Sequence, residues 1–293
     1  MAELSVMAVS EWFGRDLDRS FATIGAVLDR ARADGVRLVV LPEATLGGYL
    51  TDLMGDEAVE LPPVIDLNGR ALRRLRALAG DIVVCVGLCE SDGVDRYNSA
   101  VCLTGDGLLA VHRKVHQPLA EDHSYAAGSS FDAFDTPVGR MGMVICYDKA
   151  FPEGARTLAV DGAEVIACLS AWPASRSNAA PRLEDDRWTH RFDLYDQARA
   201  LENQVLWVSA NQCGTFGSMR FVGRAKVVGP GGEVLAATGV DGGLAIATVD
   251  VDEALSAARR GMFHLRDRRP DAYRLGAHRL GAPSLVDTSS VPA

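Results

Sequence analysis

Residues 141–153 read Met-Gly-Met-Val-Ile-Cys-Tyr-Asp-Lys-Ala-Phe-Pro-Glu, and the rest of the chain can be understood from them. The apolar residues predict a buried strand over 141–146, and Pro152 predicts the start of a helix over 152–162. Cys146 therefore ends a strand just before a helix. The unpaired N–H groups of a helix N-terminus favour a thiolate and a developing oxyanion, which makes Cys146 a candidate nucleophile. Most free cysteines are small buried hydrophobes, and this stretch alone favours that explanation.

Strands and helices alternate on both sides of this stretch. Apolar runs predict further strands at 3–10, 36–41, 82–89, 131–136, 163–171, 205–210 and 244–251. Amphipathic segments predict further helices at 18–35, 68–80 and 184–204. Predicted hairpins within 97–114 and 221–237 interrupt the alternation, and a wholly parallel sheet would not contain them.

The sequence therefore predicts an α/β fold in which two mixed β-sheets carry helices on their outer faces. No Pro-, Gly- or Ser-rich linker divides the chain, so we expect a single domain over 1–280. The residues at 281–293 are expected to form a flexible tail.

Composition excludes several classes of function. The net charge of −9 over 293 residues does not suit a general nucleic-acid binder. The N-terminus lacks the basic segment of a signal peptide, and no apolar run approaches the roughly 18 residues of a membrane helix. Six cysteines without Cys-x-x-Cys pairs predict reduced thiols, not a disulfide framework or a zinc site. We expect a soluble cytoplasmic protein with neither nucleic-acid nor membrane partners.

Three polar residues of different chemistry stand at the ends of predicted strands: Glu43, Lys114 and Cys146. Taken singly, Glu43 could cap the next segment and Lys114 could be a solvated edge charge. Strand ends on one side of a sheet converge on one cleft, however, so together they predict a site. A carboxylate there can take the thiol proton, a thiolate can attack a carbonyl or nitrile carbon, and an ammonium can stabilise the oxyanion.

The segments that carry these residues resemble the Glu-Lys-Cys signature of the nitrilase superfamily of carbon–nitrogen hydrolases. Within that superfamily, the sequence is similar to the amidase and N-carbamoyl-amine hydrolase branch. The signature segments are 41–43, 113–116 and 145–153. Further resemblance to the family's late helix, second hairpin and tail is found at 198–203 with Asn211, 230–235 and 268–273.

The resemblance implies an αββα sandwich that pairs with a second copy, giving a homodimer or a higher homo-oligomer. It implies neither a metal nor an organic cofactor. Carried across by position, Glu43 is the general base, Lys114 the oxyanion-stabilising cation and Cys146 the nucleophile. The backbone N–H of Tyr147 joins the oxyanion hole.

Family members often carry a second glutamate in the loop after the lysine. Glu121 fits that position by its spacing to Gly128 and is expected to be a fourth catalytic residue, and Asp122 is the rival. Two departures from the family pattern are Gln117, where leucine is usual, and Ala225, where serine is often found. The first lies beside the expected pocket and affects the inference of substrate.

Residues that would line the substrate pocket are suggested only by their loop positions. They are Tyr49, Tyr147, Trp172, His123 and Arg176. Packing in the core is an equal alternative for Trp172. His112 and His116 have i, i+4 spacing on a strand and turn, which does not favour a metal site.

The residues after Cys146 guide the choice of substrate. True nitrilases typically continue with Trp-Glu-Asn, whereas 147–149 read Tyr-Asp-Lys and 151–153 read Phe-Pro-Glu. The leading hypothesis is hydrolysis of a small linear amide or N-carbamoyl C–N bond through a Cys146 thioester, with release of ammonia. One alternative is a nitrilase that makes a carboxylic acid from a nitrile. Another is a non-catalytic member that binds a ligand.

Overall fold

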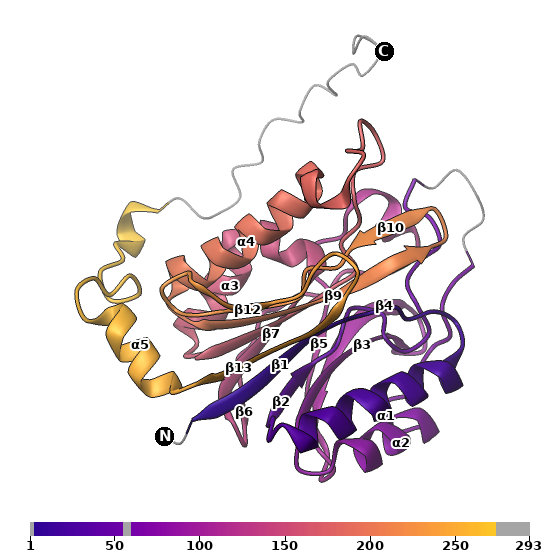
Figure 1. Ribbon diagram of the computed structural model, residues 1–293, viewed down its shortest axis with the longest axis horizontal. Coiled ribbons are helices and arrows are strands. Elements are labelled where there is room, and N and C mark those ends of the chain that lie inside the picture. The colour runs from indigo at the N-terminus through magenta and orange to yellow at the C-terminus, as the bar shows by residue number, and fades with distance from the viewer. Residues whose placement is uncertain (1–2, 55–59, 274–293) are drawn as a thin grey trace.

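The computed structural model describes residues 3–54 and 60–273, which form four stacked layers (Figure 1). Two helices cover one outer face, α1 (Leu17–Ala33) and α2 (Arg70–Ala79). Two others cover the opposite face, α3 (Pro152–Val160) and α4 (Arg187–Asn203). The two β-sheets lie between them, as the alternating sequence pattern predicts.

The first sheet comes mainly from the N-terminal half and the second from the C-terminal half. Strands of the first are β1 (Leu4–Glu11), β2 (Leu38–Val40), β3 (Val83–Ser91), β4 (Arg96–Leu103), β5 (Leu108–Arg113) and β13 (Gly243–Val249). Strands of the second are β6 (Phe134–Thr136), β7 (Gly139–Ile145), β8 (Val165–Ser170), β9 (Leu206–Phe216), β11 (Lys226–Val228) and β12 (Val234–Ala237). Parallel and antiparallel neighbours occur in both, so each sheet is mixed.

The two sheets are continuous at one corner. The strand order runs β5-β4-β3-β2-β1-β9-β8-β7-β6, and β1 meets β9 only where Ser10 pairs with Asn211 and Glu11 with Gln212. Elsewhere the sheets lie face to face, with β3 against β8 and β4 against β7. The chain therefore forms a sandwich whose two sheets are joined along one edge.

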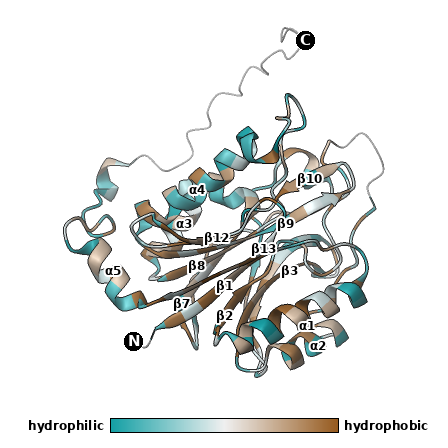
Figure 2. Ribbon diagram, viewed as in Figure 1, coloured by the Kyte–Doolittle hydropathy of each residue, from teal (hydrophilic) through white to brown (hydrophobic). Residues whose placement is uncertain are grey.

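The alternation of side chains along each strand separates three hydrophobic cores. Val6 of β1 and Ile145 of β7 point into one central core between the sheets. Their neighbours point the other way: Met7 packs beneath α1, and Val144 packs beneath α3. Successive strand residues face opposite sides of a sheet, so one strand supplies two layers. Figure 2 shows the resulting apolar strands enclosed by helices with hydrophilic outer surfaces.

One predicted hairpin is divided in the structure. The expected strand at 221–228 consists of β10 (Met219–Val222), which pairs with β9, and β11, which pairs with β12. Gly223 and Arg224 have positive φ values of 64° each, and this left-handed segment turns the chain from one ladder to the next. Because apolar residues flank the turn on both sides, the sequence pattern did not reveal it.

A helix that the sequence analysis did not predict follows β13. Helix α5 (Val251–Arg259) begins where the side chain of Asp250 accepts a hydrogen bond from the N–H of Glu253. An aspartate at that position is a good N-cap signal, but no element was predicted after the strand expected at 244–251.

The predicted tail at 281–293 lies outside the described residues, as does 274–280, so the domain boundary stays a prediction. Among the described residues, no helix has the length and apolar character needed to cross a membrane.

Candidate active site

Glu43 is placed by a close crossing of two backbones. It follows β2, and the turn that carries it passes over Gly87 of β3, whose N–H donates to the carbonyl of Pro42. A Cβ atom at Gly87 would lie 2.4 Å from the backbone nitrogen of Ala44. Only glycine leaves room for this crossing, and it leaves the Glu43 side chain fully buried.

A buried network joins Glu43 to residues from several other elements. The Nζ atom of Lys114 lies 2.8 Å from Glu43 Oε1 and 2.7 Å from Glu121 Oε2. Asn98 on β4 donates through Nδ2 to both carboxylates, at 2.7 Å each. The second oxygen of Glu43 accepts the backbone N–H of Ala171 at 2.6 Å. The two carboxylates are therefore held on either side of one ammonium.

Burial and charge act in opposite directions on this network. Burial favours the neutral amine of Lys114, but Glu121 and Glu43 outweigh it and hold the pKa of Lys114 well above its ordinary value. Burial raises the pKa of Glu121, and Glu43 adds to this while Lys114 opposes it. The lysine is therefore a permanent cation at neutral pH.

Cys146 lies beside the network in a strained conformation. It begins the 3₁₀ turn Cys146–Ala150 directly after β7, and its φ of 49° is unusual for a residue other than glycine. Burial and the charge of Glu43 raise the pKa of the Cys146 thiol well above its ordinary value, although Lys114 and the N–H of Ala171 oppose this. The resting thiol keeps its proton, so its reaction needs a base. We call Glu43, Lys114, Glu121 and Cys146 the Glu–Lys–Cys cluster.

Asp148 connects the strand ends that carry Lys114 and Cys146. Its Oδ1 accepts hydrogen bonds from the backbone N–H of His116 at 2.8 Å and from His116 Nδ1 at 2.9 Å. Its Oδ2 accepts the N–H of Ile145 at 3.0 Å and lies 3.3 Å from His112 Nε2. Burial would raise the pKa of Asp148, but the hydrogen bonds from the two histidines outweigh it and hold that pKa below its usual range. The carboxylate thus ties the first sheet to the second.

A second buried carboxylate holds the same turn from the side of α4. Lys149 Nζ lies 2.8 Å from Asp196 Oδ1, and Lys226 Nζ lies 2.8 Å from Asp196 Oδ2. Trp207 Nε1 donates to the same carboxylate, and Arg199 Nε donates to the carbonyl of Lys149. The sequence analysis identified neither this cluster nor the role of Asp148. The lysines that bind Asp196 and the histidines that contact Asp148 lie 30 or more residues from these aspartates in the chain.

A cavity of about 470 Å³ opens above Cys146. Tyr49, Tyr147 and Trp172 line it, as does Arg176, so these expected pocket residues are brought together. Trp172 also packs in the central core, and its Nε1 donates to the carbonyl of Trp188. The two explanations offered for this tryptophan therefore both apply.

His123 does not reach this cavity, which corrects the expectation from its loop position. The 3₁₀ turn Leu119–His123 buries Glu121 and directs the next two side chains to solvent. The side chain of His123 is 71% exposed and that of Asp122 is 62% exposed. Glu121, and not its rival Asp122, therefore joins the buried network.

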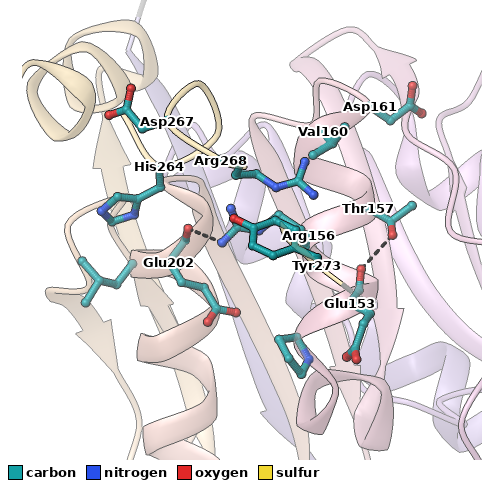
Figure 3. Close-up of a pocket in the computed structure, with 12 residues that line it drawn as sticks. Glu153, Arg156, Thr157, Val160, Asp161, Glu202, His264, Asp267, Arg268 and Tyr273 are labelled. Carbon is teal, nitrogen blue, oxygen red and sulfur yellow. Dashed lines mark hydrogen bonds between the residues drawn. The ribbon is translucent and has the colours of Figure 1, made fainter. Parts of the chain in front are cut away.

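A larger hollow lies elsewhere, between α3, the C-terminal end of α4 and the segment 264–273 (Figure 3). It measures about 1100 Å³, and Arg156 there donates to the carbonyl of Glu202. No member of the Glu–Lys–Cys cluster lines it. The reactive side chains therefore identify the smaller cavity as the candidate active site, whereas a choice by cavity volume alone would not.

Among residues 3–54 and 60–273, no group of His, Cys, Asp or Glu side chains is arranged to hold a metal.

Comparison with known proteins agrees with this geometry. The model of the carbon-nitrogen hydrolase family matches residues 9–259. The chain belongs to this family of enzymes. Our hydrolase is 32% identical to a nitrilase of Pyrococcus abyssi over 86% of its own length and 87% of the relative's. It is 31% identical to an (R)-stereoselective amidase of a Pseudomonas species, over 87% and 88%.

A solved structure confirms the fold of the hydrolase. The carbon-nitrogen hydrolase of Helicobacter pylori G27 superposes with a TM-score of 0.80 and 25% identity, covering 92% of this chain and 97% of the other. The resemblance to the nitrilase superfamily and the predicted α/β architecture are therefore confirmed. Since relatives of both kinds are found, the comparisons do not choose between amides and nitriles.

Proposed function

We propose that this hydrolase cleaves the C–N bond of a small linear amide or N-carbamoyl compound and releases ammonia. The observation that carries the proposal is the buried Glu–Lys–Cys cluster beneath a cavity of substrate size. The cluster contains a nucleophile, a base within one hydrogen-bonded network and a fixed cation. These are the groups that acyl transfer through a covalent intermediate requires.

In the first half of the reaction, Glu43 takes the proton of the Cys146 thiol while the sulfur attacks the carbonyl carbon. Negative charge then develops on the carbonyl oxygen, where the Lys114 ammonium and the N–H of Tyr147 stabilise it. The protonated Glu43 gives its proton to the leaving nitrogen. The C–N bond breaks, ammonia departs, and the acyl group remains as a thioester on Cys146.

In the second half, water replaces the amine. Glu43 takes a proton from a water molecule as its oxygen attacks the thioester carbon. The same two donors stabilise the second oxyanion, the C–S bond breaks, and the proton returns to the sulfur. The products are a carboxylic acid, or a carbamic acid from an N-carbamoyl substrate, and the free thiol. Glu121 touches no reacting atom in this scheme and acts as a positioning residue for Lys114.

A nitrilase is the alternative, because the same groups can add the thiol to a nitrile carbon. The similarity to the Pyrococcus abyssi nitrilase supports this second candidate. A non-catalytic, ligand-binding protein is a further alternative, but it gives no reason to bury two carboxylates and an ammonium beside a strained cysteine.

Ammonia release from aliphatic amides, N-carbamoyl amines and nitriles tests these possibilities. We expect the native hydrolase to act on at least one amide or N-carbamoyl compound, and Cys146→Ala to act on none. Turnover of nitriles without amides would replace the first candidate with the second. No release from any class, with Cys146 still open to a thiol-directed reagent, would favour the binding protein.

We also propose that the hydrolase is a cytoplasmic homodimer. All six cysteines are buried free thiols, which supports a reducing compartment. Val160 on α3 and Leu201 on α4 are 55% and 48% exposed beside the large hollow of Figure 3, and such a surface suits contact with a second copy.

A further inference from the structure

The cavity above Cys146 has a closed inner end and a basic outer end. Cys146 is only 4% exposed, whereas Arg176 and Arg187, which also line the cavity, reach solvent. The walls also include the rings of Trp172 and Trp188, whose centroids lie 5.5 Å apart. A substrate whose carbonyl meets Cys146 therefore extends along aromatic walls toward the arginines.

The charge of Arg176 is already balanced. Its Nη1 lies 2.7 Å from Asp52 Oδ1, and the same oxygen accepts the hydroxyl of Ser218 at 2.6 Å. These hydrogen bonds, together with one from the N–H of Met54, lower the pKa of Asp52 to about 2. Asp52 therefore remains ionised and neutralises Arg176 at any physiological pH.

Arg187 has no such partner among the described residues. Its Nη2 donates to the carbonyl of Ser177 at 2.8 Å and to the hydroxyl of Ser177 at 3.2 Å, which are neutral acceptors. The adjacent Asp186 is the N-cap of α4, and its Oδ1 accepts hydrogen bonds from Ser175 and from the N–H of Trp188. No acidic side chain lines the cavity within residues 3–54 and 60–273.

We propose that the natural substrate carries a carboxylate at the end remote from the scissile carbonyl, and that Arg187 binds this carboxylate. This inference rests on the proposed function and narrows its substrate class. An arginine fork matches a carboxylate in shape and charge. The aromatic walls suit a short aliphatic chain between the two ends. A cationic substrate, such as an N-carbamoyl diamine, would bring its charge to an outer end that is lined by two arginines and, among the described residues, by no carboxylate.

Three amides of equal chain length separate these possibilities. They are the monoamide of glutaric acid, pentanamide and 5-aminopentanamide, which end in a carboxylate, a methyl group and an ammonium. We expect kcat/KM, measured as ammonia release, to be at least about tenfold higher for the glutaric monoamide than for pentanamide. We expect 5-aminopentanamide to be the poorest. Equal values, or a preference for the amine, would overturn the inference.

Variants of Arg187 test the residue through a ratio of two substrates. Arg187→Ala should reduce the preference for the glutaric monoamide over pentanamide at least about tenfold, mainly through KM. Arg187→Glu should shift the preference toward 5-aminopentanamide. A fall in the amount of folded enzyme lowers both rates equally and leaves the ratio unchanged. The control is Arg182→Ala, because Arg182 is 72% exposed and lies outside the cavity.

The outcomes distinguish this inference from the proposed function. If the native enzyme hydrolyses amides but Arg187→Ala keeps the native preference, the inference fails and the function stands. If neither these amides nor the wider panel of amides and N-carbamoyl compounds releases ammonia, the proposed function fails and the inference fails with it.

Discussion

At the scale of single residues, the central feature is one lysine shared by two buried carboxylates. An ammonium without partners would be costly to bury, and so would either carboxylate. Lys114 therefore satisfies two needs at once, because it neutralises Glu43 and is fixed in place by Glu121. In the proposed mechanism, Glu43 is free to exchange a proton because Glu121 keeps the lysine in position.

Replacing Glu121 tests this division of labour. Glu121→Gln removes one negative charge and places its amide NH2, a donor, against Lys114 Nζ or Asn98 Nδ2, which are also donors. The lysine therefore loses its fixed position. We expect kcat to fall about 10²-fold with a smaller change in KM, measured by ammonia release. Asp122→Asn is the matched control, since Asp122 is exposed and should be replaceable without effect. Full kcat in Glu121→Gln would remove the positioning role.

The thiol of Cys146 provides a test based on pH. Its pKa is raised well above the ordinary value of 9.0, mainly by burial, so the protonated form should persist through neutral pH. We expect the ultraviolet difference spectrum, native minus Cys146→Ala, to show no thiolate at pH 7 and to gain thiolate absorbance only above about pH 9. A thiolate signal at pH 7 would mean that Lys114 outweighs burial and Glu43.

At the scale of elements, the position of Glu43 depends on a strand neighbour with no side chain. The turn after β2 fits over β3 only because residue 87 is glycine. Glu43, the proposed base, is thus aligned by backbone packing in addition to its own hydrogen bonds. A substitution at Gly87 would therefore displace Glu43 although no residue of the Glu–Lys–Cys cluster had been replaced.

Gly87→Ala should therefore impair both stability and turnover. We expect a loss of about 1–3 kcal/mol in the free energy of unfolding, measured with denaturant, and a clear fall in kcat. Gly25→Ala in α1 is the matched control, because a Cβ atom there meets nothing within 4 Å. That change should stabilise the protein by about 0.5–1 kcal/mol at normal kcat. Equal effects of the two substitutions would contradict the crossing argument.

The arrangement of the elements also explains which site residues could be predicted from the sequence. Glu43, Lys114 and Cys146 could be found because each follows an apolar run, and the ends of neighbouring strands converge. Asp148 and Lys149 lie in the same segment as Cys146, but their partners come from distant parts of the chain. No local sequence pattern predicts such pairs. His123 was placed wrongly because a 3₁₀ turn alternates buried and exposed side chains over one or two residues, which loop position alone does not predict.

At the scale of the whole molecule, the exposed apolar side chains on α3 and α4 predict association. We expect the hydrolase to sediment as a particle of twice its 31.3 kDa chain mass. Leu201→Glu, which places a charge in the lining of the large hollow beside α3, should shift the population toward monomers. Val94→Glu is the control, since Val94 is 89% exposed in the turn between β3 and β4. A monomeric native protein would refute the proposed dimer.

The tie formed by Asp148 has a consequence for the whole sandwich. Glu43 and Lys114 stand on the first sheet, Cys146 stands on the second, and Asp148 bridges the gap. The spacing between the sheets is therefore a kinetic variable, because a shift of about 1 Å in a reacting group can cost about 10²-fold in rate. Expansion of the central core would abolish hydrolysis even though both sheets stayed folded. A fall in turnover should therefore report a loosening of the contact between the two sheets before the protein begins to unfold.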